Sequence, residues 1–141
     1  MTFKEMNAAV MLLGSVVISG WVLRDALSGP PMALSDVAAR LCWAIGAAIV
    51  FNIVAIIVFA ILVSIAQGHE IKDERADERD RAIGAKAMRN AYVVASLAGL
   101  AVLVTWAMGQ EATTGAYVLF GGLMLAGAAD ATSRLVYYRL G

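Results

Sequence analysis

Residues 41–66 read LCWAIGAAIVFNIVAIIVFAILVSIA, a run of 26 residues without a charged side chain. As an α-helix rising about 1.5 Å per residue, this run is about 39 Å long, longer than the ~30 Å hydrocarbon core of a bilayer. A run of this length is typical of a transmembrane helix. We therefore predict a membrane-spanning helix over residues 36–67, either tilted or extending past the lipid headgroups.

Three further apolar segments accompany this run, at residues 7–23, 88–108 and 115–137. Helices are the expected structure, because hydrocarbon offers no partner for unpaired backbone groups. The last two segments are separated by only a few residues, which predicts a tight antiparallel hairpin. The sequence thus predicts an all-α fold, with residues 1–141 forming a single integral membrane domain folded as a four-helix bundle.

The composition agrees with this class and excludes others. Hydrophobic residues make up 61% of the chain and charged residues 16%, and the mean hydropathy is +0.77, whereas soluble domains are nearer half apolar and a quarter charged. Eleven basic residues balance eleven acidic ones without a sustained basic tract, so we expect no direct nucleic-acid binding. One cysteine and one histidine, with no nucleophile triad and no phosphate-binding glycine loop, predict no enzymatic activity, no metal and no cofactor.

The basic residues predict the orientation. Cytoplasmic termini place nine basic residues inside the cell and leave two, Arg24 and Arg40, outside, which satisfies the positive-inside rule. The nine are Lys4, Lys72, Arg75, Arg79, Arg81, Lys86, Arg89, Arg134 and Arg139. We therefore predict a multi-pass protein of a bacterial inner membrane with both termini cytoplasmic.

The connection at residues 69–90 reads HEIKDERADERDRAIGAKAMRN and holds six acidic and six basic residues. Asp77 and Glu78 precede Arg81 by four and three residues, the spacings of helical ion pairs, so we expect a charged helix that continues into the third span. The connection has three interpretations, a solvated loop, a docking surface for a cytoplasmic protein, or a membrane-surface segment, which the acidic residues disfavour because they oppose anionic lipid. Charges of both signs suit protein recognition better than phosphate binding. The candidate partner-binding residues are Asp73, Arg75, Asp77, Glu78, Arg79 and Arg81.

This segment also resembles a known family. The run 73–75 (DER), the run 77–80 (DERD), Ile83, the pair 86–87 (KA) and the run 89–92 (RNAY) are similar to a family of small predicted bacterial membrane proteins. The similarity covers about residues 70–108. The family has about four helices and no assigned enzymatic activity, and its genes often lie beside a small DNA-binding regulator of the helix-turn-helix or a similar class. The resemblance implies a membrane protein that tethers and restrains a transcription regulator.

Polar residues inside the spans form a second set of candidates: Asn52, Asp130 and Arg134. Arg134 follows Asp130 by four residues, so we expect a structural ion pair that offsets the cost of placing a lone carboxylate in the membrane, roughly 3 kcal/mol at its centre. The alternatives for Asp130 are proton or substrate coupling and a helix–helix contact with a basic residue of the 69–90 connection. For Asn52 we expect an interhelical or homodimeric hydrogen bond in preference to a polar pathway. Asp36 and Arg40, also four apart, are expected to pair.

These observations give a preferred function and two alternatives. The preferred function is a membrane-embedded regulatory protein, an anti-activator that sequesters a cytoplasmic DNA-binding transcription regulator. The alternatives are a small transporter or channel that uses Asp130 and Asn52, and an immunity-type or structural membrane interaction protein. Membrane lipid is the other expected contact. Small residues spaced by four, such as Cys42 and Gly46 or Gly122 and Ala126, let helices approach closely inside the bundle, in a homodimer, or in both.

Overall fold

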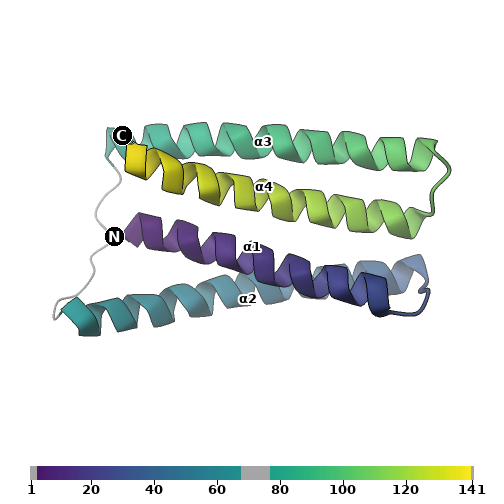
Figure 1. Ribbon diagram of the computed structural model, residues 1–141, viewed down its shortest axis with the longest axis horizontal. Helices are drawn as coiled ribbons and strands as arrows, with labels where there is room; N and C mark the ends of the chain where they lie inside the picture. Colours follow the sequence, from purple (N-terminus) through teal and green to yellow (C-terminus); the bar gives the residue numbers. More distant parts are fainter. Residues whose placement is uncertain (1–2, 68–76, 141) are drawn as a thin grey trace.

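The computed structural model describes residues 3–67 and 77–140. Four helices make up this part of the chain, α1 (Phe3–Ser28), α2 (Leu34–Gln67), α3 (Glu78–Ala107) and α4 (Ala112–Leu140), and it includes no strand. Each helix is long and apolar enough to cross a membrane. The prediction of an all-α chain with four such helices is confirmed, and the chain ends lie at the same end of the helices (Figure 1).

Helix α3 begins at Glu78, ten residues before the predicted apolar segment at 88–108, and from Glu78 on the expected charged helix does continue into that segment. The reason is a reciprocal cap at its first turn. The Asp77 carboxylate accepts from the Asp80 backbone N–H at 2.7 Å, and the Asp80 carboxylate accepts from the Asp77 backbone N–H at 3.2 Å. Such a capping box satisfies amides that the first helical turn leaves unpaired. The charged residues after Glu78 therefore belong to the same helix as the apolar residues that follow.

Helices α3 and α4 form the tightest pair in the structure. Gly109, at φ +74°, makes the turn between them, a conformation that side chains with a Cβ rarely adopt. Along the hairpin, a Cβ at Gly122 would lie 2.1 Å from the Ala98 Cβ, so the two backbones meet where both residues are small. The predicted small-residue contact at Gly122 and Ala126 thus serves the packing inside this chain.

The remaining helices pack in the order α4, α1, α2. Ser15 of α1 faces Gly127 of α4, with its Oγ 3.6 Å from where a Gly127 Cβ would lie. Helix α2 contacts α1 and, through fewer residues, α4, while its described residues have no contact with α3. Its buried residues all belong to its first half, where they join the core of α1 and α4. They are Val37, Leu41, Ala44 and Ala48.

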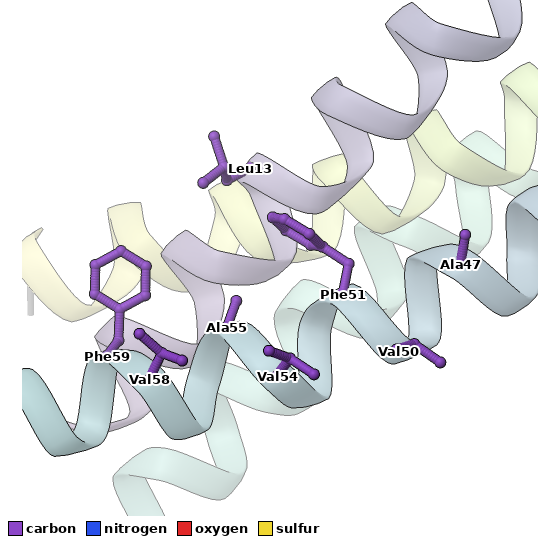
Figure 2. Close-up of a pocket in the computed structure, with 8 residues that line it drawn as sticks. All are labelled: Leu13, Ala47, Val50, Phe51, Val54, Ala55, Val58 and Phe59. Carbon is purple, nitrogen blue, oxygen red and sulfur yellow. The ribbon is translucent and has the colours of Figure 1, made fainter.

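After its contact with Gly14 at Phe51 and Asn52, α2 diverges from α1, and its end lies apart from the other helices in Figure 1. The divergence opens a groove of about 630 Å³ between α1 and α2. Figure 2 shows its apolar lining, Leu13 from α1 and Ala47, Val50, Phe51, Val54, Ala55, Val58 and Phe59 from α2. The second half of α2 is therefore the least packed apolar part of the described chain.

The predicted pair of Asp36 and Arg40 is wrong. Arg40 Nη1 instead donates to Asp25 Oδ2 at 2.7 Å, which joins the start of α2 to the end of α1. The connection between these helices is short, so the long Arg40 side chain reaches a carboxylate on the neighbouring helix. The ion pair marks the end of the bundle opposite the chain termini.

The glycine contact between α3 and α4 gives a direct test of this packing. Gly122→Ala places a methyl group against Ala98, and overpacking of this kind costs about 1–3 kcal/mol. We expect a lower melting temperature in mild detergent. The matched control is Gly121→Ala, because a Cβ at Gly121 meets no atom within 4 Å. Equal melting temperatures for the two variants would contradict the close approach.

Candidate functional site

Three helices meet at the end of the bundle where both termini lie. The Lys4 ammonium of α1 forms an ion pair with the Asp80 carboxylate of α3, and the Tyr138 hydroxyl of α4 donates to the same carboxylate at 3.1 Å. Asp80 also accepts from the Asp77 backbone N–H. All three side chains are half-buried. We call Lys4, Asp80 and Tyr138 the terminal junction. It fixes the first turn of α3 against α1 and α4.

Of the predicted partner-binding residues, Asp73 and Arg75 lie outside the described residues. Glu78, Arg79 and Arg81 follow the cap of α3 and are exposed to solvent. We call these three residues the α3 tip. They present one negative and two positive charges next to the terminal junction.

Asp77 caps α3 and does not form the predicted helical ion pair with Arg81. Its backbone is extended, with φ −77° and ψ 179°, and its carboxylate accepts from the Asp80 N–H at the start of the helix. Arg81 is connected to Asp77 through the backbone, since its N–H donates to the Asp77 carbonyl oxygen at 3.1 Å. The expected side-chain pair of Asp77 and Arg81 is therefore replaced by a helix cap, because Asp77 precedes the helix rather than lying on its face.

A second polar layer joins α3 to α4 closer to the middle of the helices. Asn90 Nδ2 donates to the Ser133 Oγ at 3.0 Å and to the Tyr137 Oη at 3.1 Å. The Lys86 ammonium lies 6.0 Å from the centre of the Tyr137 ring. Sequence reasoning did not single out Asn90 and Ser133 as partners. Equal spacing from the turn would not have found this pair, because Asn90 lies 19 residues before Gly109 and Ser133 lies 24 residues after it.

The predicted pair of Asp130 and Arg134 is confirmed. Arg134 Nε donates to Asp130 Oδ2 at 2.8 Å and Nη2 to Oδ1 at 3.2 Å, a two-pronged contact of half-buried groups. The Arg134 guanidinium also extends over Gly84 of α3, where a Cβ would lie 3.4 Å from Nη1. In a region of low dielectric such a pair compensates two charges that would otherwise be costly to bury.

Asn52 lies against α1 near the middle of the bundle. Its Nδ2 donates to the Ala48 carbonyl oxygen of its own helix at 2.8 Å, so the hydrogen bond expected across helices runs within α2. A Cβ at Gly14 would lie 2.9 Å from the same nitrogen, which shows how closely α1 covers this side chain. The buried Oδ1 has no hydrogen-bond partner in the described chain. Asn52 and Asp130 share no described contact, so these two candidates do not form one site.

Comparison with known protein families, with curated proteins and with solved structures finds no match for this chain.

The terminal junction predicts a local effect of Asp80→Ala. This change removes the Lys4 pair, the Tyr138 hydrogen bond and half of the capping box at once. A lost cap costs about 1 kcal/mol, so amide hydrogen exchange in the first turns of α3 is expected to rise at least about fivefold. The control is Arg79→Ala, which changes an exposed neighbour on the same turn. Unchanged exchange in the Asp80 variant would show that the junction does not hold the helix start.

Proposed function

We propose that this chain is a multi-pass protein of a bacterial inner membrane that binds and restrains a cytoplasmic DNA-binding transcription regulator. The observation that carries the proposal is the α3 tip, an exposed set of charges on a capped helix beside the terminal junction. The resemblance of residues 70–108 to small bacterial membrane proteins encoded beside such regulators supplies the class of partner.

The way the α3 tip is held favours recognition over a merely solvated connection. A loop that only links two spans needs no ion pair to a third helix, yet Asp80 bonds to both Lys4 and Tyr138. Holding a binding surface in place before the partner arrives reduces the entropy lost on binding. The mixed charges of Glu78, Arg79 and Arg81 suit a partner surface of complementary pattern, because like charges brought together disfavour wrong partners.

The distribution of the described basic residues supports cytoplasmic termini. The end with the terminal junction carries seven, and the opposite end carries Arg24 and Arg40. This asymmetry follows the positive-inside rule. The seven are Lys4, Arg79, Arg81, Lys86, Arg89, Arg134 and Arg139.

Restraint of the regulator needs only modest energetics. A regulator bound at the membrane is kept from its DNA sites, and a change in the bundle that weakens the contact releases it. A coupling of about 1–3 kcal/mol changes affinity by roughly 5–150-fold, which is sufficient for a switch.

The partner surface is tested by charge reversal at the α3 tip. Arg79→Glu combined with Arg81→Glu is expected to reduce, by at least about tenfold, the amount of the proposed transcription regulator that co-purifies in mild detergent, since reversed charges at a contact repel. The control is Arg24→Glu, an exposed residue at the opposite end of the helices. Retention of the regulator by the double variant would refute this surface.

The orientation is tested by cysteine labelling in whole cells. Cys42 is the only cysteine in the sequence, so Cys42→Ser gives a background in which single cysteines report position. An impermeant maleimide is expected to label Arg24→Cys in intact cells and Arg79→Cys only after the membrane is opened. The reverse pattern would place the α3 tip outside the cell and exclude a cytoplasmic partner.

A further inference from the structure

We propose that Lys86 and Arg89 of α3 bind the headgroup phosphate of an anionic phospholipid. The headgroup of this lipid is drawn toward the middle of the membrane beside α3 and α4. The inference rests on the membrane-spanning part of the proposed function and goes beyond it, because it assigns a lipid site that the regulator does not use. Its basis is the position of these two cations along the bundle axis, here called their height, relative to the apolar surface of α2.

The helix contacts fix that height. Gly14 of α1 lies opposite Asn52 of α2. Lys4 is ten residues before Gly14 and Leu62 is ten residues after Asn52, so in this antiparallel pair Leu62 stands at the height of Lys4. Lys4 in turn bonds to Asp80 of α3. The exposed apolar surface of α2 therefore reaches the height of the first turn of α3.

On α3 the cations lie well inside that level. Lys86 and Arg89 follow Asp80 by six and nine residues, which at 1.5 Å per residue is about 9 and about 13.5 Å toward the middle of the bundle. A flat bilayer boundary that covers α2 down to Leu62 thus leaves both cations within the hydrocarbon. Charged groups at that depth draw headgroups and water inward.

The surroundings leave both charges uncompensated by protein. Both side chains are exposed, and among the described residues neither has a carboxylate partner. The nearest acid at this height on the neighbouring helix, Asp130, is already neutralised by Arg134. Behind the cations, Asn90 is bonded to Ser133 and Tyr137, which gives a polar wall without net charge. Lys86 lies 6.0 Å from the centre of the Tyr137 ring, which carries no net charge, so two positive charges remain to complement a net-negative headgroup.

The exposed residues around the cations are of the kind found at a membrane interface. Met88 is 66% exposed and Tyr92 is 72% exposed, and Tyr92 follows Arg89 by one helical turn. Tyrosine is enriched at the level of lipid headgroups, where its ring is apolar and its hydroxyl is wet. Helical side chains also point toward the N-terminus of their helix, so Lys86 and Arg89 extend toward the charged end and the headgroups of that leaflet.

The test uses the full chain in lipid nanodiscs of phosphatidylcholine alone or mixed with phosphatidylglycerol. Native mass spectrometry measures how many phosphatidylglycerol molecules remain after mild delipidation, and the melting temperature is followed in both lipids. We expect the native chain to retain phosphatidylglycerol and to melt higher in its presence. Lys86→Gln with Arg89→Gln is expected to lower the preference for phosphatidylglycerol over phosphatidylcholine by about fivefold for each cation, roughly 25-fold together.

The matched control is Arg79→Gln with Arg81→Gln, which removes the same charge from the same helix at the α3 tip. This control is expected to keep the lipid preference, and so is the conservative variant Lys86→Arg with Arg89→Lys, which checks folding. Inorganic phosphate added in excess is expected to leave the retained lipid unchanged, because the site is reached from the bilayer.

Several outcomes would overturn the lipid site. An equal loss of the phosphatidylglycerol preference in both glutamine double variants would mean that the lipid is held only by general attraction to positive charge. Displacement of the lipid by inorganic phosphate would mean that the ligand is a free anion. If Lys86→Gln with Arg89→Gln instead lowers the amount of captured regulator and leaves the retained lipid unchanged, these cations belong to the surface that binds the regulator. Failure of the membrane premise is distinguishable, because the chain would then be released from membranes by alkaline carbonate.

Discussion

The carboxylate of Asp80 joins the beginning of α3 to the two helices that end or start beside it. It pairs with Lys4 of α1, accepts from Tyr138 of α4 and completes the cap with Asp77. A helix start has amides without internal partners, and the first turn of α3 needs contacts to the neighbouring helices to hold it in place. Because one side chain meets both needs, the orientation of the α3 tip depends on the packing of α1 and α4 below it.

Packing is uneven across the molecule, and the unevenness follows residue size. Gly122 and Ala98 let α3 and α4 approach closely, which is how helices gain contact energy when lipid is as apolar as their own side chains. Helix α2 instead carries valine, isoleucine and phenylalanine beyond Ala48. In its apolar, membrane-length stretch 6% is buried inside the protein, against 33% in the corresponding stretch of α1. Helix α2 is therefore the element that can change position with the least loss of protein contacts.

The sequence predicted the features that depend on local spacing and apolar length. Four apolar segments predicted four helices, and the four-residue spacing of Asp130 and Arg134 predicted their ion pair. The same spacing misled for Asp77, which lies before the helix, and for Arg40, which pairs across a turn with Asp25. The Lys4–Asp80 pair joins residues 76 positions apart. Finding it requires the rotation and register of three helices, which tertiary packing sets and hydropathy does not encode.

Helix α3 links the two proposed sites through one continuous hydrogen-bonded rod. Its tip carries Glu78, Arg79 and Arg81, and the cations Lys86 and Arg89 follow within the next two to three turns. A helix bends little without proline or a break in its hydrogen bonds, and no proline lies between Glu78 and Ala107. A change in lipid that shifts the cations must therefore move the tip as well or break the terminal junction. Since Asp80 lies within the tip and fixes it to α1 and α4, it is the residue through which a membrane signal would reach a bound regulator.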